Sequence, residues 1–417
     1  MARGAAEDSK ERHWDSSFHW DDGFGDMTPA ARVQAAIELL DEIVAAAREG
    51  GAAADTLIAR YFKTRRYAGS KDRRAVRELV FRAIRRAGER PASGRAAMLG
   101  LVRDDPGLAP WFDGSPHGPA PIQPDEDAAE AGIAPDWLLP RFDPLVSADE
   151  WPALLERAPL DLRVNRLKAA RDPVLVPGSA PTPLSPVGLR LAESGNVEQT
   201  DAWKEGLIEV QDEGSQLLVF ACAARPGMNV VDLCAGAGGK TLALAAEMAN
   251  EGCIVASDTD RARLTRMGPR LARAGVSIVE SRLLDPDREV AALADLAGRA
   301  DLVLVDAPCS GTGTWRRNPE ARWRLTPDRL TRLAALQARL LDIAATLVAP
   351  GGALVYAVCS LLAEEGRGQA DAFSARSSLV VEPPPISAGR AAGPGVLLTP
   401  AHDGTDGFFV ARWRRPC

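Results

Sequence analysis

The hydrophobic positions in the first quarter of the chain recur at helical spacing. From Thr28, with Pro29 behind it as a helix start, the segment TPAARVQAAIELLDEIVAAAREG places apolar residues three and four apart and ends on glycines. The same spacing recurs in ADTLIARYF and in RAVRELVFRAIRRAG. These patterns predict an all-helical unit over residues 27–105. Residues 1–26 are polar without a clear period, and we expect them to form a flexible tail.

The next two stretches differ from this unit in their composition. Pro, Gly and Asp are frequent in residues 106–130, which is typical of a linker. Residues 131–210 mix helix-like and strand-like segments, namely WLLPRF, ADEWPALLERA and PLDLRVNRLKA. They predict a small α+β unit.

The remainder of the chain, residues 211–417, alternates apolar strands with amphipathic helices. The strands are expected at 229–233, 253–258, 276–280, 301–306, 352–358 and 407–413, and the helices include 261–274 and 328–348. This alternation predicts an α/β fold with a doubly wound, Rossmann-like and mostly parallel sheet covered by helices on both faces. Ligands bind such sheets at the carboxyl ends of the strands, so the residues that follow each strand are the candidates for chemistry.

The first of these strands leads into a Gly-rich turn, in NVVDLCAGAGGKT. An ATP-binding loop needs a Gly five positions before Gly239, and the chain has Cys234 there. A dinucleotide fingerprint begun at Gly236 and Gly238 would need its third small residue at Thr241. Spacing therefore argues against both phosphate-binding loops and leaves the strand–turn–helix of another nucleotide-type site.

Composition limits the class of protein. The 417 residues are 46% hydrophobic and 26% charged, which is typical of two or three soluble domains. No apolar run reaches the roughly 20 residues of a membrane helix, and the first residues lack the apolar core of a signal peptide, so we expect a cytoplasmic protein. The six cysteines form no C-x-x-C pair and the chain has four histidines, so we expect neither a metal site nor disulfides.

Charge is distributed unevenly along the chain. The net charge is -7, yet residues 60–90 hold twelve Lys or Arg against three Asp or Glu, and residues 315–339 hold seven against two. One such run alone could be a solvated helix face. Two of them in an acidic protein favour a polyanionic partner such as a nucleic acid.

Carboxylates stand at the ends of the predicted strands. Asp258 closes its strand twenty positions after Gly238, where a carboxylate can accept hydrogen bonds from a ribose diol. Each carboxylate alone could be a helix cap. Together with Asp232, Asp285 and Asp306, however, Asp258 forms an acidic rim, which suits a positively charged nucleoside such as S-adenosylmethionine better than ATP.

Two thiols are expected at the same edge of the sheet. Cys309 follows the strand that ends at Asp306, with Pro308 fixing the turn, and Cys359 ends the next strand. A buried cysteine is usually an inert small hydrophobe. Two thiols at the ends of successive strands, each followed by Ser, are explained more readily by chemistry than by packing.

These segments resemble a known family. DLCAGAGGKT, VLVDAPCSGTGTWRRNPEARW and VYAVCSLLAEE resemble the signature motifs of the Sun/Fmu-type RNA cytosine-5 methyltransferases. Upstream, LRVNRLKAARD, TPLSPVGLRL and TDAWKEGLIEVQDEGSQL resemble the small RNA-binding domain of that family, and RYAGSKDRRAVRELVFRAIRR resembles the antitermination-factor-type (NusB-like) RNA-binding domain of its bacterial ribosomal RNA members. The resemblance covers about residues 28–417. The chain departs from the usual pattern at Gly236, Ala237 and Ala363, none of which is a reacting group.

The resemblance implies methyl transfer from S-adenosylmethionine to C5 of a cytidine in RNA, with small-subunit (16S) ribosomal RNA as the expected substrate. It implies that Cys359 adds to C6 of the base and that Cys309 assists release. It also implies that Asp306 bonds the cytosine ring and that Lys240 orients the base or Asp306. The implied cofactor contacts are Cys234, Ala235, Gly236, Ala237, Gly238, Gly239, Lys240, Asp258 at the ribose, Asp285 facing the adenine, and Asp306. Gln211 and Asp212 are expected to contact the substrate or to line the cofactor pocket.

Two other functions stay open at this point. The same chemistry could act on transfer RNA, or the chain could be an RNA-binding or assembly factor whose methyltransferase fold is inert. The two thiols together with Asp306 and Asp258 speak against the second function, because a scaffold has no need of them. We expect RNA as the partner, no membrane, no metal and a monomer.

Overall fold

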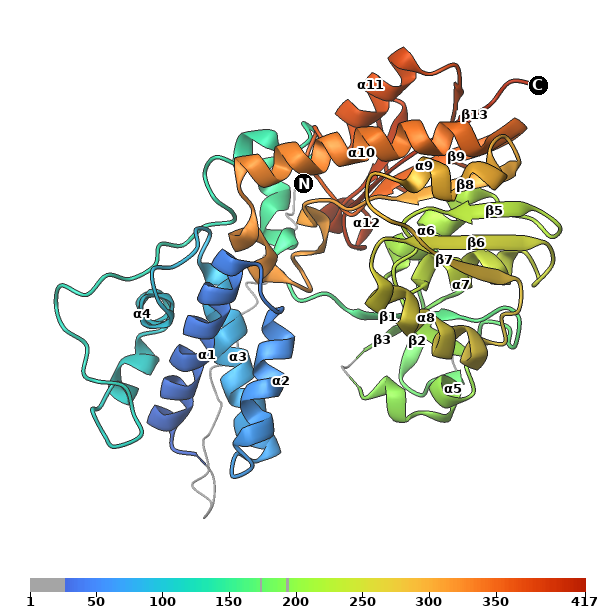
Figure 1. The fold of residues 1–417 in the computed structure, drawn as a ribbon. Helices are drawn as coiled ribbons and strands as arrows, with labels where there is room; N and C mark the ends of the chain where they lie inside the picture. Colours follow the sequence, from blue (N-terminus) through green and yellow to red (C-terminus); the bar gives the residue numbers. More distant parts are fainter. Residues whose placement is uncertain (1–26, 173–174, 193–194) are drawn as a thin grey trace, which may run out of the picture.

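The computed structural model describes residues 27–172, 175–192 and 195–417, so the predicted tail, residues 1–26, lies outside the described residues. Figure 1 shows a helical N-terminal part beside a larger α/β part, with a small sheet below the large one. None of the helices in the described ranges is long and apolar enough to cross a membrane.

The N-terminal part consists of α1 (Pro29–Glu49), α2 (Ala54–Thr64), α3 (Ser70–Arg86) and α4 (Gly94–Asp104). The predicted start of α1 is confirmed, because Thr28 accepts a hydrogen bond from the Ala31 N–H at 3.2 Å. The helix ends at Gly50, whose φ of 74° lies in the left-handed region. The apolar faces of the helices share one core, which includes Val33, Leu40 and Ile84.

Residues 106–130, predicted as a linker, run back along the helices. They begin with the short 3-10 helix η1 (Pro106–Trp111). Arg95 then pairs with Glu126 at 2.8 Å, and the Ala129 N–H donates to the carbonyl of Ala96 at 2.9 Å. The segment therefore lies against α4 as part of the helical unit's surface.

A small antiparallel sheet follows, in the order β2-β3-β1-β4. Its elements are β1 (Leu160–Val164), β2 (Ser179–Pro181), β3 (Gly188–Leu191), η5 (Val197–Gln199), α5 (Asp201–Lys204) and β4 (Ile208–Val210). The preceding 3-10 helices, η2 (Leu139–Arg141) and η3 (Ala148–Leu154), pack with their neighbours Leu138 and Phe142 on the core of the large sheet instead. The small sheet thus begins at Leu160, and the division of the chain into domains stays a prediction.

The large sheet is built from strands in the order β11-β12-β13-β9-β8-β5-β6-β7, with β10 paired to β13. Its strands are β5 (Asn229–Asp232), β6 (Cys253–Asp258), β7 (Val279–Leu283), β8 (Ala300–Asp306), β9 (Val348–Val358), β10 (Val380–Glu382), β11 (Arg390–Ala392), β12 (Gly395–Leu398) and β13 (Phe408–Arg414). The five strands from β9 to β7 are parallel, and β13 is antiparallel to β9.

This order confirms the predicted doubly wound, Rossmann-like fold. One predicted strand, 276–280, lies three residues further along the chain, at Val279–Leu283, although the preceding helix ends where it was expected, at Ala274. The expected strands do not include β10, β11 and β12, because three or four residues are too few to show a hydrophobic period.

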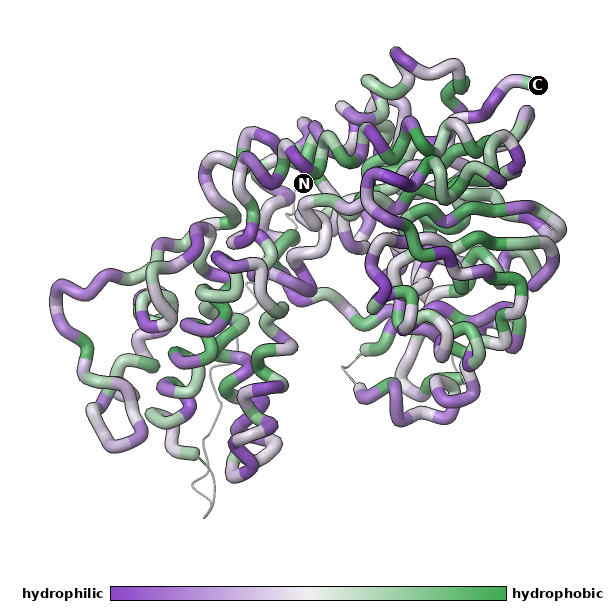
Figure 2. The backbone as a smooth tube through the Cα atoms, in the orientation of Figure 1, coloured by the Kyte–Doolittle hydropathy of each residue, from purple (hydrophilic) through white to green (hydrophobic). Residues whose placement is uncertain are grey.

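Helices cover both faces of the large sheet. They are α6 (Glu213–Cys222), α7 (Gly239–Glu247), α8 (Arg261–Ala274), α9 (Glu289–Ala292), α10 (Pro327–Leu347), α11 (Arg367–Arg376) and α12 (Pro400–Asp403), with the short η6 (Ala294–Leu296). Along β8, Leu302 and Leu304 pack with α6 and α7, whereas Val303 and Val305 pack with α10 and α11. Because successive strand residues point to opposite faces, both faces of the strand are apolar, and Figure 2 shows the strands in green.

The helical part is joined to the α/β part by the chain that follows β8. This chain forms η7 (Thr312–Thr314) and η8 (Pro319–Arg324). Trp323 of η8 is buried in the core of the helical part, and Arg322 is fully buried against the end of α3. Glu320 accepts a hydrogen bond at 3.0 Å from the N–H of Ala54, where α2 begins. The chain next to Cys309 therefore supplies part of the core and the helix caps of the N-terminal part.

Candidate active site

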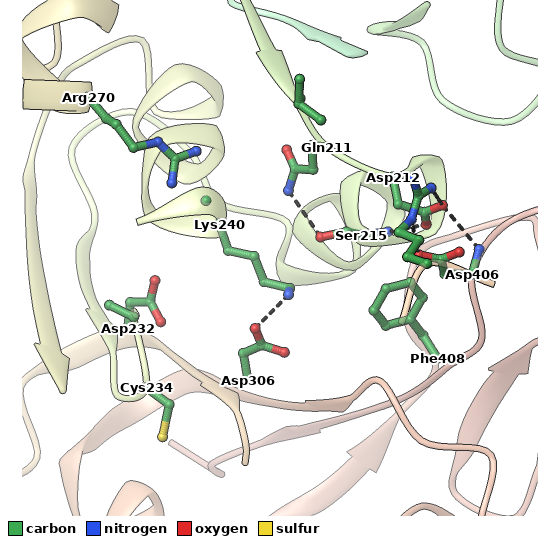
Figure 3. A pocket seen from close by; sticks show the side chains of 14 residues that line it. Gln211, Asp212, Ser215, Asp232, Cys234, Lys240, Arg270, Asp306, Asp406 and Phe408 are labelled. Carbon is green, nitrogen blue, oxygen red and sulfur yellow. Dashed lines mark hydrogen bonds and ion pairs between the residues drawn. The ribbon is translucent and has the colours of Figure 1, made fainter. Parts of the chain in front are cut away.

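A cavity of about 390 Å³ opens at the carboxyl ends of β5 and β8, the point at which the strand order reverses. Its volume lies in the range of small-molecule sites, roughly 300–1,000 Å³. Figure 3 shows its side chains converging from the large sheet, from α6 and from the strand that precedes α6. The cavity is lined by Val210, Gln211, Asp212, Ser215, Asp232, Cys234, Ala235, Gly239, Lys240, Arg270, Asp306, Arg317, Asp406 and Phe408.

An ion pair stands at the centre of this cavity. Lys240, in the first turn of α7, donates to the carboxylate of Asp306 at the end of β8 with an Nζ–Oδ2 distance of 2.6 Å (Figure 3). Burial by itself lowers the pKa of Lys240, but the charge of Asp306 and the hydrogen bond to it outweigh this effect, so the pKa is raised. Lys240 is therefore a fixed positive charge at the sheet edge.

The Gly-rich turn is held by two strand-end carboxylates. Asp258 accepts from the Gly236 N–H at 2.8 Å, and Asp232 accepts from the Thr241 hydroxyl at 2.7 Å. Burial raises the pKa of Asp232 to about 7. The other oxygen of Asp232 is buried and has no hydrogen-bond partner among the described residues. One wall of the site thus carries an acceptor that no described group satisfies.

The two predicted thiols meet beside the ion pair. The Sγ atoms of Cys309 and Cys359 lie 3.3 Å apart, and both side chains are half-buried. The hydrogen bond with Cys359, together with burial, raises the pKa of the Cys309 thiol well above its usual value. Cys309 is therefore a protonated thiol at neutral pH, in contact with the sulfur of Cys359.

The structure places the predicted residues in two groups. Those in the cavity wall are Gln211, Asp212, Cys234, Ala235, Gly239, Lys240 and Asp306. Those outside that wall are Gly236, Ala237, Gly238, Asp258, Asp285, Cys309 and Cys359. Within the second group, Asp258 contacts the Gly-rich turn, whereas the side chain of Asp285 is exposed after β7. No group of three or more metal-ligating side chains occurs in the described part of the chain.

Sequence reasoning missed an arginine that ties three segments together at the cavity. Arg317 pairs with Asp212 at 2.9 Å and with Asp406 at 2.6 Å, and it also donates to the carbonyl of Pro159. Arg317 lies in the basic run of residues 315–339, for which the sequence predicts a polyanionic partner. The sequence does not indicate its two carboxylate partners, because both are distant along the chain. A second missed residue, Arg270 of α8, joins the carbonyl of Ala237 to Glu209 of the small sheet.

A buried carboxylate beside the thiols was also missed. Glu365 is fully buried and accepts hydrogen bonds from residues that follow both Cys309 and Cys359. The motif VYAVCSLLAEE contains it, yet its spacing from Cys359 carries no periodic signal.

The residues of this site fit S-adenosylmethionine. Built side-chain carbons at Gly236, with a φ of 57°, and at Gly239 would meet nothing within 4 Å, so the turn leaves room above its backbone. Asp232, one oxygen of which has no hydrogen-bond partner among the described residues, and Asp306 both line the cavity, where carboxylates suit a ligand with a positive charge. When bound, this cofactor supplies a methyl group on a sulfonium.

Comparison with known proteins identifies the family of this chain. The family model described as 16S rRNA methyltransferase RsmB/F matches residues 219–414. A protein of Citrobacter koseri named ribosomal RNA small subunit methyltransferase B is 35% identical over 290 residues, which are 67% of this chain and 66% of that protein. The protein of the same name in Erwinia tasmaniensis is 34% identical over 296 residues, which are 69% of this chain and 67% of that protein. The chain thus spans about two thirds of the length of these relatives.

Similarity extends to solved structures. The crystal structure of PH0851 aligns with a TM-score of 0.71 at 25% identity, covering 92% of this chain and 99% of that one. This alignment includes the N-terminal helices as well as the large sheet. From its sequence relatives and its fold, the chain belongs to the RsmB/F family of 16S rRNA methyltransferases, enzymes whose cofactor is S-adenosylmethionine.

Proposed function

We propose that this protein transfers a methyl group to C5 of a cytidine in small-subunit ribosomal RNA. The observation that carries the proposal is the meeting of two thiols, 3.3 Å apart, at the sheet edge that also holds the Lys240–Asp306 ion pair. A scaffold protein gains nothing from this arrangement. A cytosine methyltransferase needs a nucleophile, a group to assist its departure and a polar clamp on the base.

The chain's own groups would act in the following order. The C5 atom of cytosine is too weak a nucleophile to take a methyl group unaided. Addition of the Cys359 sulfur to C6 moves an electron pair toward C5 and makes that carbon nucleophilic. After methylation, a water molecule in the open site takes the C5 proton, and the electron pair of the C5–H bond restores the ring double bond. The bond between sulfur and C6 breaks at the same time, and its electron pair returns to the Cys359 sulfur. Cys309 would assist this release, because its thiol contacts the departing sulfur.

Asp306 and Lys240 would hold the base. We assign Asp306 to the N3 or amino group of cytosine. At the amino group its carboxylate accepts an N4–H hydrogen bond, which uracil, with a carbonyl oxygen at that position, cannot donate. Lys240 holds this carboxylate in place through the contact at 2.6 Å. The target base must leave the RNA stack to reach them, as is general for enzymes that act on bases.

The cofactor would lie on the Gly-rich turn. We assign the methionine part to Cys234 through Lys240, the ribose to Asp258 and the adenine to the region of Asp285. The room above Gly236 and Gly239 supports the first assignment. The position of Asp258 at the end of β6 supports the second, because carboxylates at this place in such folds accept from ribose hydroxyls.

The RNA would be held by the N-terminal part as well. Exposed basic side chains surround the turn between α2 and α3, namely Lys63, Arg66, Lys71 and Arg74. Within the described ranges, none of the four forms an ion pair, and Tyr67 beside them is 67% exposed. Basic groups around an exposed aromatic ring suit single-stranded RNA, whose bases stack and whose phosphates pair with cations. Figure 2 shows this end of the helices in purple.

Replacing Lys63, Arg66 and Lys71 by alanine together is expected to raise the KM for RNA about tenfold or more and to leave kcat unchanged. Loss of about three phosphate contacts should also reduce the slope of log affinity against log salt by roughly two. Steady-state kinetics at several salt concentrations would measure both. Arg103→Ala, which removes an exposed arginine of α4, is the control and should change neither. Unchanged salt dependence in the triple variant would place the RNA elsewhere.

The reaction and its substrate can be tested together. Bisulfite sequencing of total RNA from cells with and without the gene should show the loss of one 5-methylcytosine in 16S ribosomal RNA. Loss of a transfer RNA site instead would keep the chemistry and replace the substrate. No change in any RNA would favour a non-catalytic RNA-binding or assembly factor.

A further inference from the structure

The loops that carry the two thiols are joined by one buried carboxylate. Glu365 is 0% exposed. Its carboxylate accepts from the Ser310 N–H at 2.9 and 3.2 Å and from the Ser360 hydroxyl at 2.6 Å. Ser310 and Ser360 directly follow Cys309 and Cys359 in the sequence. A single side chain thus holds the residue after each thiol.

Neighbouring groups fix this carboxylate in turn. The Gln337 side chain of α10 donates at 2.9 Å both to Glu365 and to the carbonyl of Pro308, just before Cys309. The Tyr356 hydroxyl of β9 donates to the backbone carbonyl of Glu365 at 2.7 Å. The carboxylate therefore has little freedom to move without moving the two loops.

Further hydrogen bonds link the same loops directly. The hydroxyl oxygens of Ser310 and Ser360 lie 3.1 Å apart, and the Leu361 N–H donates to the Thr312 hydroxyl at 2.8 Å. The Gly313 N–H donates to the carbonyl of Cys359 at 3.0 Å. Together with the Glu365 carboxylate, which accepts from Ser310 and Ser360, these contacts hold the two sulfur atoms in contact.

We propose that Glu365 is a positioning residue that keeps the Cys309 and Cys359 sulfur atoms in contact, so that the covalent RNA adduct is released efficiently. The proposal rests on the proposed function, because release matters only if Cys359 forms such an adduct. Glu365 itself does not touch the base. It acts through the two loops.

The chemistry of the network explains why a carboxylate is needed at this position. Every group that points at the Glu365 side chain is a donor: the Ser310 N–H, the Ser360 hydroxyl and the Gln337 amide. An ionised carboxylate accepts on both oxygens. In Glu365→Gln, one of these oxygens becomes an NH₂ group that faces donors. Two donors then face each other in a buried place without an acceptor, and the two loops are expected to separate.

A first test needs no RNA. It measures how readily Cys309 and Cys359 form a disulfide, which depends on how closely the two sulfur atoms are held. The protein is equilibrated in buffers of reduced and oxidised glutathione, in which one oxidised glutathione takes up the two electrons and two protons of Cys309 and Cys359. Peptide mapping by mass spectrometry quantifies the disulfide. Below the thiol pKa values, the equilibrium constant reports how closely the two sulfurs are held. We expect Glu365→Gln to lower this constant tenfold or more.

A second test uses RNA and measures release. Protein mixed with substrate RNA and S-adenosylmethionine is denatured, and the covalent complex is quantified on a gel. In Glu365→Gln the adduct should accumulate at least tenfold over the wild-type protein. Glu364→Gln, which alters the neighbouring carboxylate paired with Arg141, is the matched control and should behave as the wild type in both tests.

The outcomes separate the two proposals. A wild-type equilibrium constant and a wild-type amount of adduct in a folded Glu365→Gln protein would overturn the positioning role. Should this variant not fold, Ser360→Ala keeps the Glu365 carboxylate and removes its 2.6 Å contact with the Ser360 hydroxyl, together with the contacts of that hydroxyl at 3.1 to 3.3 Å. It is expected to shift both measurements in the same direction by a smaller factor. Absence of any adduct, even in Cys309→Ser, would overturn the proposed function while the glutathione measurement still decides the role of Glu365.

Discussion

Cys359→Ser will abolish methyl transfer, whereas Cys309→Ser will stop the reaction one step later with RNA bound covalently to the protein. The first change removes the sulfur that adds to C6, and a serine hydroxyl is a much weaker nucleophile in its place. Loss of an essential nucleophile costs at least about 1,000-fold in rate. The second change leaves the nucleophile intact and removes the thiol in contact with it at 3.3 Å.

Incorporation of tritiated methyl groups into RNA measures the first effect, and a denaturing gel of the protein–RNA complex measures the second. Cys253→Ser is the control, because Cys253 is half-buried at the amino end of β6, away from the cavity. It should retain activity. If Cys359→Ser formed the adduct and Cys309→Ser formed none, the two roles would be exchanged.

Arg322→Ala is expected to destabilise the N-terminal helices by about 3 kcal/mol or more. The Arg322 guanidinium is fully buried and donates to the carbonyls of Ile84, Arg85 and Ala87 at 2.6, 2.9 and 2.8 Å. These are the last carbonyls of α3, which no longer have partners within the helix. Burial lowers the pKa of Arg322 to about 9, so the group remains charged at neutral pH and also complements the negative end of the helix.

Hydrogen exchange of the α3 amides would show the loss as faster opening, and calorimetry would show a lower melting temperature. Arg329→Ala on the exposed surface of α10 is the control and should change stability by less than about 0.5 kcal/mol. Unchanged protection of α3 in Arg322→Ala would mean that water replaces the guanidinium at these carbonyls. The helical part would then be held to the chain that follows Cys309 by the other contacts of η8, such as buried Trp323 and the cap by Glu320.

The contact between η8 and the N-terminal helices also links the basic turn to the two thiols. The segment η8 lies between the Cys309 loop and the helices that carry the basic turn, and Trp323 is buried within the helical core. RNA bound at the basic turn would therefore be held at a constant distance from the two thiols.

Local signals were sufficient for much of the architecture. The apolar runs of β6 and β8 are long enough to be recognised, and Thr28 with Pro29 marks the start of α1. The order of a parallel sheet then places the residues after β8 and β9 at one edge, which is why Cys309 and Cys359 could be paired before their distance was known. Short strands such as β11 and β12 carry too few residues for any period.

The sequence by itself determined the class of fold, the Gly-rich turn without a phosphate-binding loop, and the strand ends at which carboxylates and thiols stand. These are properties of neighbouring residues, since periodicity and turn chemistry act over a few positions. The tertiary structure alone decided that Glu365 joins both thiol loops, that Arg317 pairs with Asp406, and that Arg322 caps a helix 238 positions away. Such contacts depend on how separate elements pack, and the charge or hydrogen-bonding capacity of a residue does not reveal which distant group will satisfy it.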